Sequence, residues 1–190
     1  GLGKEMAELT DLAMNGELPL EAVYERRLSL IGPDKQAIDR LAAQYVDEVV
    51  EGAVEVIREL QKHGKQVHII SGGIRQAILP LAEYLGVPGK NVHAVDVIFD
   101  IDGQYQGFDT ASPLARSGGK AEVCRMLTSR SSSLVMVGDG QTDLESKQAG
   151  AFFIGFGGVV ERKGVRAQSD YYVAESTLYP LKDYILSTQC

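Results

Sequence analysis

The sequence predicts an α/β fold: a mostly parallel β-sheet core with helices on both sides, preceded by a small helical cap. From residue 50 onward, short apolar segments alternate with amphipathic helical segments, and alternation at this length is typical of parallel sheets. The first 45 residues show helical patterns only. We therefore expect a cap over residues 1–48 and an α/β core over residues 49–190.

The composition argues against several classes of protein. The chain has 190 residues, of which 44% are hydrophobic and 24% charged, which is enough apolar material for a buried core. Its 26 acidic and 19 basic residues give a formal net charge of -7, which argues against a general nucleic-acid binder. No apolar run reaches the roughly 18 residues of a membrane-spanning helix, and the two cysteines make no disulfide framework. We expect a cytoplasmic protein without nucleic-acid or membrane partners.

Three helices are predicted in the cap. Apolar residues at helical spacing over 4–15 predict the first, which Asn15-Gly16 ends. Pro19 suits the first turn of a second helix, which runs to the break at Gly32-Pro33. The third helix is predicted over 34–46.

The core begins with a helix, a strand and a second helix. An apolar face over residues 53–60 predicts the first helix, and Gly64 ends it. The short apolar run 66–70 predicts a strand. Apolar residues recur every three or four positions over 74–85, which predicts the second helix.

The second half of the core continues the alternation. Residues 94–99 predict a strand, and Asp102-Gly103 predicts a two-residue hairpin turn into a strand over 104–108. The remaining elements are a helix over 119–128, strands over 134–137, 151–154 and 170–173, and helices near 141–148 and over 176–186.

The first polar cluster, Ser71-Gly72-Gly73, follows the strand that ends at Ile70. A hydroxyl next to two glycines can cradle an anion, because backbone N–H groups can approach it and the next helix adds its positive end. The alternative is a strand-to-helix turn that needs only the flexibility of glycine.

The second cluster is Ser117-Gly118-Gly119-Lys120, at the start of a predicted helix. A lysine at this place is disfavoured by the helix dipole, so it is better explained if it faces an anion. The alternative is a solvated surface lysine.

The third cluster, Gly138-Asp139-Gly140-Gln141-Thr142-Asp143, follows an apolar strand and is the most specific of the three. Two carboxylates at positions i and i+4 suit Mg²⁺, which is held by one or two carboxylates together with water and phosphate oxygens. The alternative is an Asx turn followed by an acidic residue at a helix start.

These clusters, in this order, resemble the motifs of the haloacid dehalogenase-like superfamily, and within it the phosphoserine phosphatase family. The resemblance extends from Gly3 to about Leu186. It implies a Rossmann-like parallel core with a small helical cap and Mg²⁺-dependent phosphatase activity. The further segments that resemble the family are Met14-Asn15-Gly16, Glu25–Ile31 and Phe153–Gly158.

The resemblance implies a phosphate site and a metal site. Ser71, with the N–H groups of Gly72 and Gly73, would hold phosphate oxygens, and Lys120 would neutralise the phosphate charge. Asp139 would bind Mg²⁺ directly. Asp143 would orient Lys120 or act at the metal through a metal-bound water.

The resemblance also implies a substrate pocket. Arg27 would form a paired hydrogen bond with a substrate carboxylate, which suits a planar guanidinium. Met14 would line the cap side, and Thr142 would lie near the substrate. Leu20 departs from the family, which usually has an aromatic residue there, so the fit around the substrate is less well determined.

The nucleophile of the family is the first aspartate of an Asp-x-Asp-x-Thr motif on the first, central strand. The sequence begins inside what resembles the first cap helix, so we expect this strand to be absent from the chain. The segment Val97–Gly103 resembles the motif, but Gln104 stands where threonine is required and a hairpin explains it better. A permuted active site is the remaining alternative.

Three explanations of this absence are open: an incomplete copy of a longer product, which we favour, a non-catalytic relative that binds phosphorylated ligands, and a partner segment that supplies the strand. We expect a slot of roughly 10 Å between the strands that end at Ile70 and Val137, either open or filled by a segment from outside this chain. Direct pairing of 67–70 with 134–137 would contradict it.

The function expected from the resemblance is hydrolysis of L-phosphoserine through an aspartyl-phosphate, the final step of serine biosynthesis, with little turnover from this chain alone. The alternatives are a silent phosphoserine-binding relative and another small-molecule phosphatase or phosphotransferase of the superfamily. A homodimer is possible. The residues His63, His68 and His93 show no metal-ligand spacing. Arg162 and Arg166 are interpreted as solvated surface charges, with an extension toward the rim of the active site as the alternative.

Overall fold

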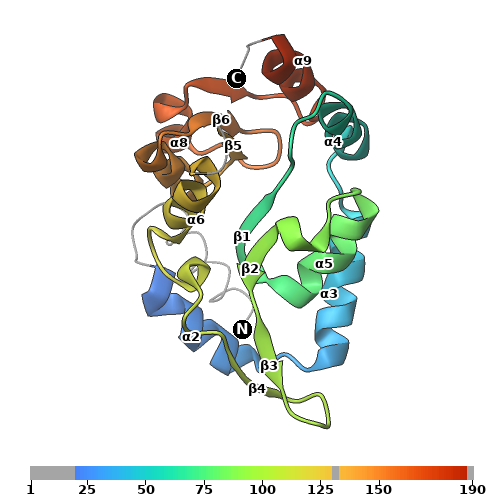
Figure 1. Ribbon diagram of the computed structural model, residues 1–190. Helices are drawn as coiled ribbons and strands as arrows, with labels where there is room; N and C mark the ends of the chain where they lie inside the picture. The colour runs from blue at the N-terminus through green and yellow to red at the C-terminus, as the bar shows by residue number, and fades with distance from the viewer. Residues whose placement is uncertain (1–19, 130–132, 188–190) are drawn as a thin grey trace. The chain divides into compact units, whose positions relative to one another are not determined.

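The computed structural model describes residues 20–129 and 133–187, and confirms an α/β fold with parallel strands (Figure 1). The chain forms two compact units, each described by itself. The Ser71 unit comprises residues 33–109 and 173–190, and the Lys120 unit comprises residues 1–32 and 110–172. The helix predicted over 4–15 and Met14 lie outside the described residues. The division into cap and core over residues 1–48 and 49–190 remains a prediction.

The Ser71 unit is built on the parallel strands β1 (Ile69–Ile74) and β2 (Val92–Val95). Helix α5 (Arg75–Tyr84) connects them and packs on both strands and on α3 (Lys35–Asp47). Ile78 and Ala82 of α5 form a buried cluster with Val87 and with Val92 of β2. Helices α4 (Ala53–Lys62) and α9 (Tyr179–Ser187) pack against each other in the same unit.

An antiparallel hairpin follows β2, formed by β3 (Val97–Phe99) and β4 (Tyr105–Phe108). Its loop spans residues 100–104, so the predicted two-residue turn at Asp102-Gly103 is wrong. The Asp100 carboxylate holds this loop, because its Oδ1 accepts the N–H groups of Asp102 and Gln104 at 2.9 and 2.8 Å. The segment that resembles a nucleophile motif is therefore a hairpin.

The Lys120 unit contains a sheet with the strand order β5-β6-β7. Strands β5 (Val135–Gly138) and β6 (Phe152–Phe156) are parallel, and β7 (Tyr171–Val173) reaches the unit boundary. Phe153 and Ile154 of β6 are fully buried, and Val123 and Cys124 in the same unit are buried as well. The other elements of the unit are α2 (Leu20–Ile31), a 3-10 turn η2 (Pro113–Ala115), α6 (Gly119–Thr128), α7 (Gln141–Leu144), a 3-10 turn η3 (Glu145–Ala149) and α8 (Lys163–Gln168).

Several expected elements differ from the structure in their bounds or continuity, among them the following three. The strand predicted over 66–70 begins at Ile69 and continues through the glycines to Ile74. The strand predicted over 94–99 is divided at Asp96. Next to this break, Gln76 Nε2 donates to the Val97 carbonyl oxygen at 2.8 Å, and Gln76 Oε1 accepts the Val97 N–H at 3.1 Å. The helix predicted near 141–148 is the short α7 followed by η3.

The strand pairing bears on the expected absence of a central strand. Within the described residues, β1 pairs with β2 in one unit and β5 pairs with β6 in the other. The slot expected between β1 and β5 remains a prediction. No helix in this part of the chain is long and apolar enough to cross a membrane.

Candidate active site

Two glycines at the start of helix α6 determine the position of Lys120. Gly118 precedes the helix with a φ of +77°, which favours glycine. A Cβ on Gly119 would lie 1.8 Å from the carbonyl oxygen of Pro113. Glycine at 119 therefore allows α6 to begin directly against η2, and Lys120 is the second residue of the helix.

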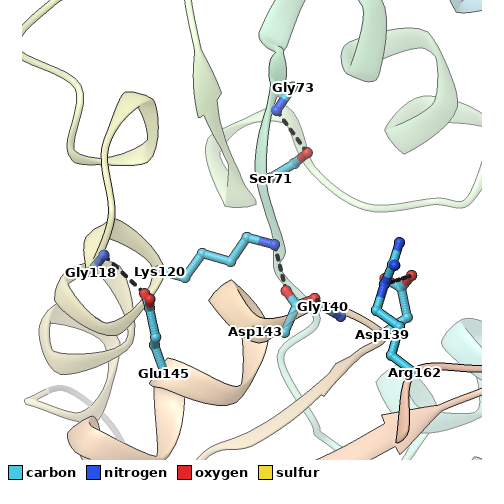
Figure 2. Close-up of polar contacts among 9 residues, drawn as sticks. All are labelled: Ser71, Gly73, Gly118, Lys120, Asp139, Gly140, Asp143, Glu145 and Arg162. Atoms are coloured by element: carbon cyan, nitrogen blue, oxygen red, sulfur yellow. Dashed lines mark hydrogen bonds and ion pairs between the residues drawn. The ribbon is translucent and has the colours of Figure 1, made fainter. Parts of the chain in front are cut away.

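Lys120 forms a largely buried ion pair with Asp143 (Figure 2). Its Nζ lies 2.5 Å from Asp143 Oδ1, and the two side chains are 14% and 5% exposed. The second oxygen, Oδ2, accepts the N–H of Gly140 at 3.0 Å. The lysine is therefore not a solvated surface residue. Because both carboxylate oxygens of Asp143 have donors, the geometry favours the orienting role of Asp143 over direct metal binding.

Asp139 lies at the end of β5, with its side chain 38% exposed. Burial, and next the charge of Asp143, raise the pKa of the Asp139 carboxyl, and the charge of Arg162 only partly opposes this. A carboxylate with uncompensated negative charge is the kind of oxygen ligand that Mg²⁺ prefers. Within the described residues no three acidic, histidine or cysteine side chains are gathered to hold a metal. Asp139 therefore fits Mg²⁺ as one ligand of a set that these residues do not complete.

The glycine before Asp139 is required by packing. A Cβ on Gly138 would lie 2.3 Å from Cγ of Asp143. The end of β5 and the first turn of α7 can approach each other only because this position has no side chain. Gly138 thus brings Asp139 and Asp143 together on adjoining elements.

Arg162 lies beside Asp139, which favours the rim of the site over a solvated surface charge. Its side chain is only 14% exposed, and its Nε lies 3.9 Å from Asp139 Oδ2 (Figure 2). It immediately precedes α8, a six-residue helix that the sequence analysis missed. No local pattern points from Arg162 to Asp139, so only the fold shows that they meet.

Glu145 is a second residue that the sequence analysis missed. Its Oε2 accepts the backbone N–H of Gly118 at 2.9 Å. Asp143 and Glu145, two positions apart, therefore hold the side chain of Lys120 and the turn before it (Figure 2). A carboxylate is also favourable at the positive end of a helix.

Two expected substrate residues lie in the same unit. Arg27, on α2, is half-buried, and its Nε is buried with no hydrogen-bond partner in the described residues. A buried donor of this kind is normally satisfied, so it is suited to an anion. Thr142 is buried on α7 beside Asp143.

The predicted phosphate cradle lies in the Ser71 unit. Ser71, Gly72 and Gly73 are half-buried within β1, and Ser71 Oγ accepts the N–H of Gly73 at 3.0 Å. The hydroxyl hydrogen of Ser71 remains able to donate. The structure thus gathers Lys120, Asp139 and Asp143 in one unit, and holds Ser71 with Gly73 in the other.

Comparison with known proteins gives matches over most of the chain. The family model for haloacid dehalogenase-like hydrolases matches residues 10–150. The phosphoserine phosphatase of Bos taurus is 37% identical over 177 residues, which cover 92% of this chain and 79% of the relative. A crystal structure of a phosphoserine phosphohydrolase-like protein from Francisella tularensis has a TM-score of 0.86 at 27% identity, covering 96% of this chain and 84% of the other. A substrate-bound phosphoserine phosphatase complex has a TM-score of 0.78 at 25% identity, covering 95% and 84%.

Proposed function

Because the chain belongs to the haloacid dehalogenase-like hydrolases, and within them to the phosphoserine phosphatase family, we propose that it serves Mg²⁺-dependent hydrolysis of L-phosphoserine to L-serine and phosphate. The observation that carries this proposal is the buried Lys120–Asp143 pair next to Asp139, whose pKa is raised. A buried cation and an undercompensated carboxylate on adjoining elements suit a phosphate with a divalent cation. The reaction would complete serine biosynthesis in the cytoplasm.

Three residues of the Lys120 unit would together stabilise the negative charge of the phosphate. Lys120 would bind phosphate oxygens and counter the charge that develops on the transferring group. Asp143 would keep its ammonium in place. Asp139 would hold Mg²⁺, which supplies further positive charge at the phosphoryl group when bound. Ser71 and the N–H groups after it would bind the remaining phosphate oxygens.

Substrate choice would depend on the amino-acid end of L-phosphoserine. The buried Nε of Arg27 has no partner among the described residues, and a carboxylate would satisfy it with a charge-assisted hydrogen bond. Thr142 and Met14 would line the pocket beside the substrate. An Arg27→Lys variant would keep the charge but lose the planar, paired contact, so KM should rise more than kcat falls.

Covalent catalysis needs an aspartate nucleophile, and the 190 residues contain no Asp-x-Asp-x-Thr segment. The proposed aspartyl-phosphate would form on such a segment. We expect the chain as given to bind phosphoserine and Mg²⁺ with little turnover. A version that carries an Asp-x-Asp-x-Thr strand before Gly1 should release phosphate.

The test compares these two proteins by phosphate release from L-phosphoserine with Mg²⁺. Two control variants of the longer protein change the first motif aspartate to asparagine and Lys120 to methionine, and both should lose turnover. If the longer protein folds and releases no phosphate from L-phosphoserine, the proposed substrate is wrong. Binding without release in that protein would favour the silent phosphoserine-binding alternative. Release from other phosphorylated acids alone would favour another phosphatase of the superfamily.

A further inference from the structure

Two histidines meet in the Ser71 unit, outside the proposed phosphatase site. His68 directly precedes β1, and His93 lies on the neighbouring β2. The ring nitrogens His68 Nδ1 and His93 Nε2 are 3.2 Å apart. The rings are stacked, with centroids 5.4 Å apart and planes inclined by 25°. The two residues are 25 positions apart, so sequence spacing could not reveal the pair.

Strand alternation places the pair on one face of the β1–β2 ladder. Val67 and Ile69, the neighbours of His68, pack against the apolar cluster beneath α5. Of the neighbours of His93, Val92 is a member of this cluster and Ala94 packs against it. Because successive side chains on a strand point to opposite faces, both imidazoles lie on the face away from that cluster.

We propose that His68 and His93 form a binding site for a divalent transition metal, for which Zn²⁺ is the best match. With Zn–N bonds of about 2.05 Å, nitrogens 3.2 Å apart subtend about 103° at the metal, close to the tetrahedral angle of about 109°. Imidazole nitrogen also selects Zn²⁺ over Mg²⁺, which prefers oxygen.

The protonation state of the pair suits metal binding. Burial lowers the pKa of both histidines, and for His93 the charges of His68 and Arg75 lower it further. Both rings are therefore neutral near pH 7, as metal ligands must be. One facing nitrogen carries the hydrogen of the ring-to-ring bond, and a change of tautomer moves it to the outer nitrogen of the same ring.

The remaining ligands would be water. In the described part of the chain no third histidine, cysteine or carboxylate joins the two rings. The nearby Arg75 is not a ligand either, because its guanidinium donates to the carbonyl oxygens of Val92 and Gly89 at 3.4 and 3.0 Å. Two protein ligands with water make a site that exchanges its metal more readily than a four-ligand structural zinc site.

The test is a Zn²⁺ titration of the full chain followed by NMR of its three imidazoles. His63 is an internal control, because it lies at the end of α4 beside Glu59. An Asp139→Asn background removes competing binding at the carboxylates, and Mg²⁺ is titrated in parallel. We expect the resonances of His68 and His93 to shift together with Zn²⁺ at one equivalent, and not with Mg²⁺.

Variants complete the test, with His68→Phe and His93→Phe each keeping an aromatic ring in place. Loss of an outer-shell partner costs about 10–100-fold in metal affinity, so loss of a ligand should cost at least about tenfold. Zn²⁺ should raise Tm in the parent and not in either variant. If a Phe variant does not fold, the His→Gln change replaces it. The proposal is overturned if His68 and His93 do not shift, or if both variants keep the parent affinity. No readout uses phosphatase activity, so this result is independent of the proposed function.

Discussion

Replacing Gly138 by alanine should disrupt the proposed site without changing any charged residue. The added Cβ would lie 2.3 Å from Asp143 Cγ and 2.5 Å from its Oδ2, against an ordinary contact of 3.4 Å or more. Asp143 must therefore move by roughly 1 Å, because packed interiors do not tolerate such overlap. Its bonds to Lys120 and to the Gly140 N–H are 2.5 and 3.0 Å long. A shift of that size brings both to the limit of hydrogen bonding or beyond.

The cost follows from the burial of the pair. Breaking a buried ion pair by removing one partner costs about 3–5 kcal/mol. Gly138→Ala displaces Asp143 without removing it, so part of the attraction to Lys120 remains. We therefore expect a loss of about 3 kcal/mol in the free energy of unfolding, the lower end of that range. Urea unfolding followed by circular dichroism measures this loss. Gly164→Ala is the matched control, because its Cβ meets nothing within 4 Å and it lies inside α8. The control should be neutral or stabilising by up to about 1 kcal/mol.

A double-mutant cycle with Lys120→Met identifies the cause. Lys120→Met should destabilise the parent protein but cost much less in the Gly138→Ala background, because the pair is already broken there. If the free energy of unfolding of Gly138→Ala lies within about 0.5 kcal/mol of the parent value, the backbone has moved to accommodate the Cβ and Asp143 has kept its contacts. That result would refute the prediction.

Three further predictions concern the same unit. Ser146 is fully buried, with no hydrogen-bond partner for its hydroxyl in the described residues, so Ser146→Ala should leave Tm unchanged or raise it; a clear drop would reveal a hidden partner. Glu145→Ala should speed amide exchange at Gly118 and cost about 1 kcal/mol, while Glu145→Gln, which still offers an acceptor oxygen, should keep most of the protection; equal exchange in both variants would argue against the hydrogen bond. The folded state raises the pKa of Asp139 and so holds its proton more tightly than the unfolded chain. Stability should therefore fall as pH rises from the ordinary carboxyl pKa through the raised one. Asp139→Asn should abolish this pH dependence, stabilise the protein at neutral pH and weaken Mg²⁺ binding, and no change in the urea midpoint with pH would contradict the raised pKa.

Local patterns were sufficient where an element is defined by its own residues. Helix α6 has the predicted bounds, because the glycines before it and the apolar spacing within it are both local signals. The neighbouring carboxylates Asp139 and Asp143 were found for the same reason, since a strand end and a helix start fix their placement.

Contacts between residues far apart in the sequence could not be predicted from local patterns. Arg162 meets Asp139 across 23 positions, and Glu145 meets Gly118 across 27. The hairpin loop was misjudged because the Asp100 carboxylate can close a longer loop than the Asp-Gly pair suggested. Each of these contacts depends on how elements pack, which periodicity does not encode.

The buried thiol of Cys124 allows the opening of helix α6 to be measured by chemical labelling. It is fully buried, and burial raises its pKa to about 11, so thiol reagents should find almost no thiolate in the closed protein. The chain has one other cysteine, Cys190, and a Cys190→Ser variant leaves a single reactive group. Its alkylation rate then measures how often α6 separates from η2 and η3, the elements against which it packs. Because Lys120 lies on the same helix, phosphate bound to Lys120 should stabilise α6 and slow the alkylation of Cys124.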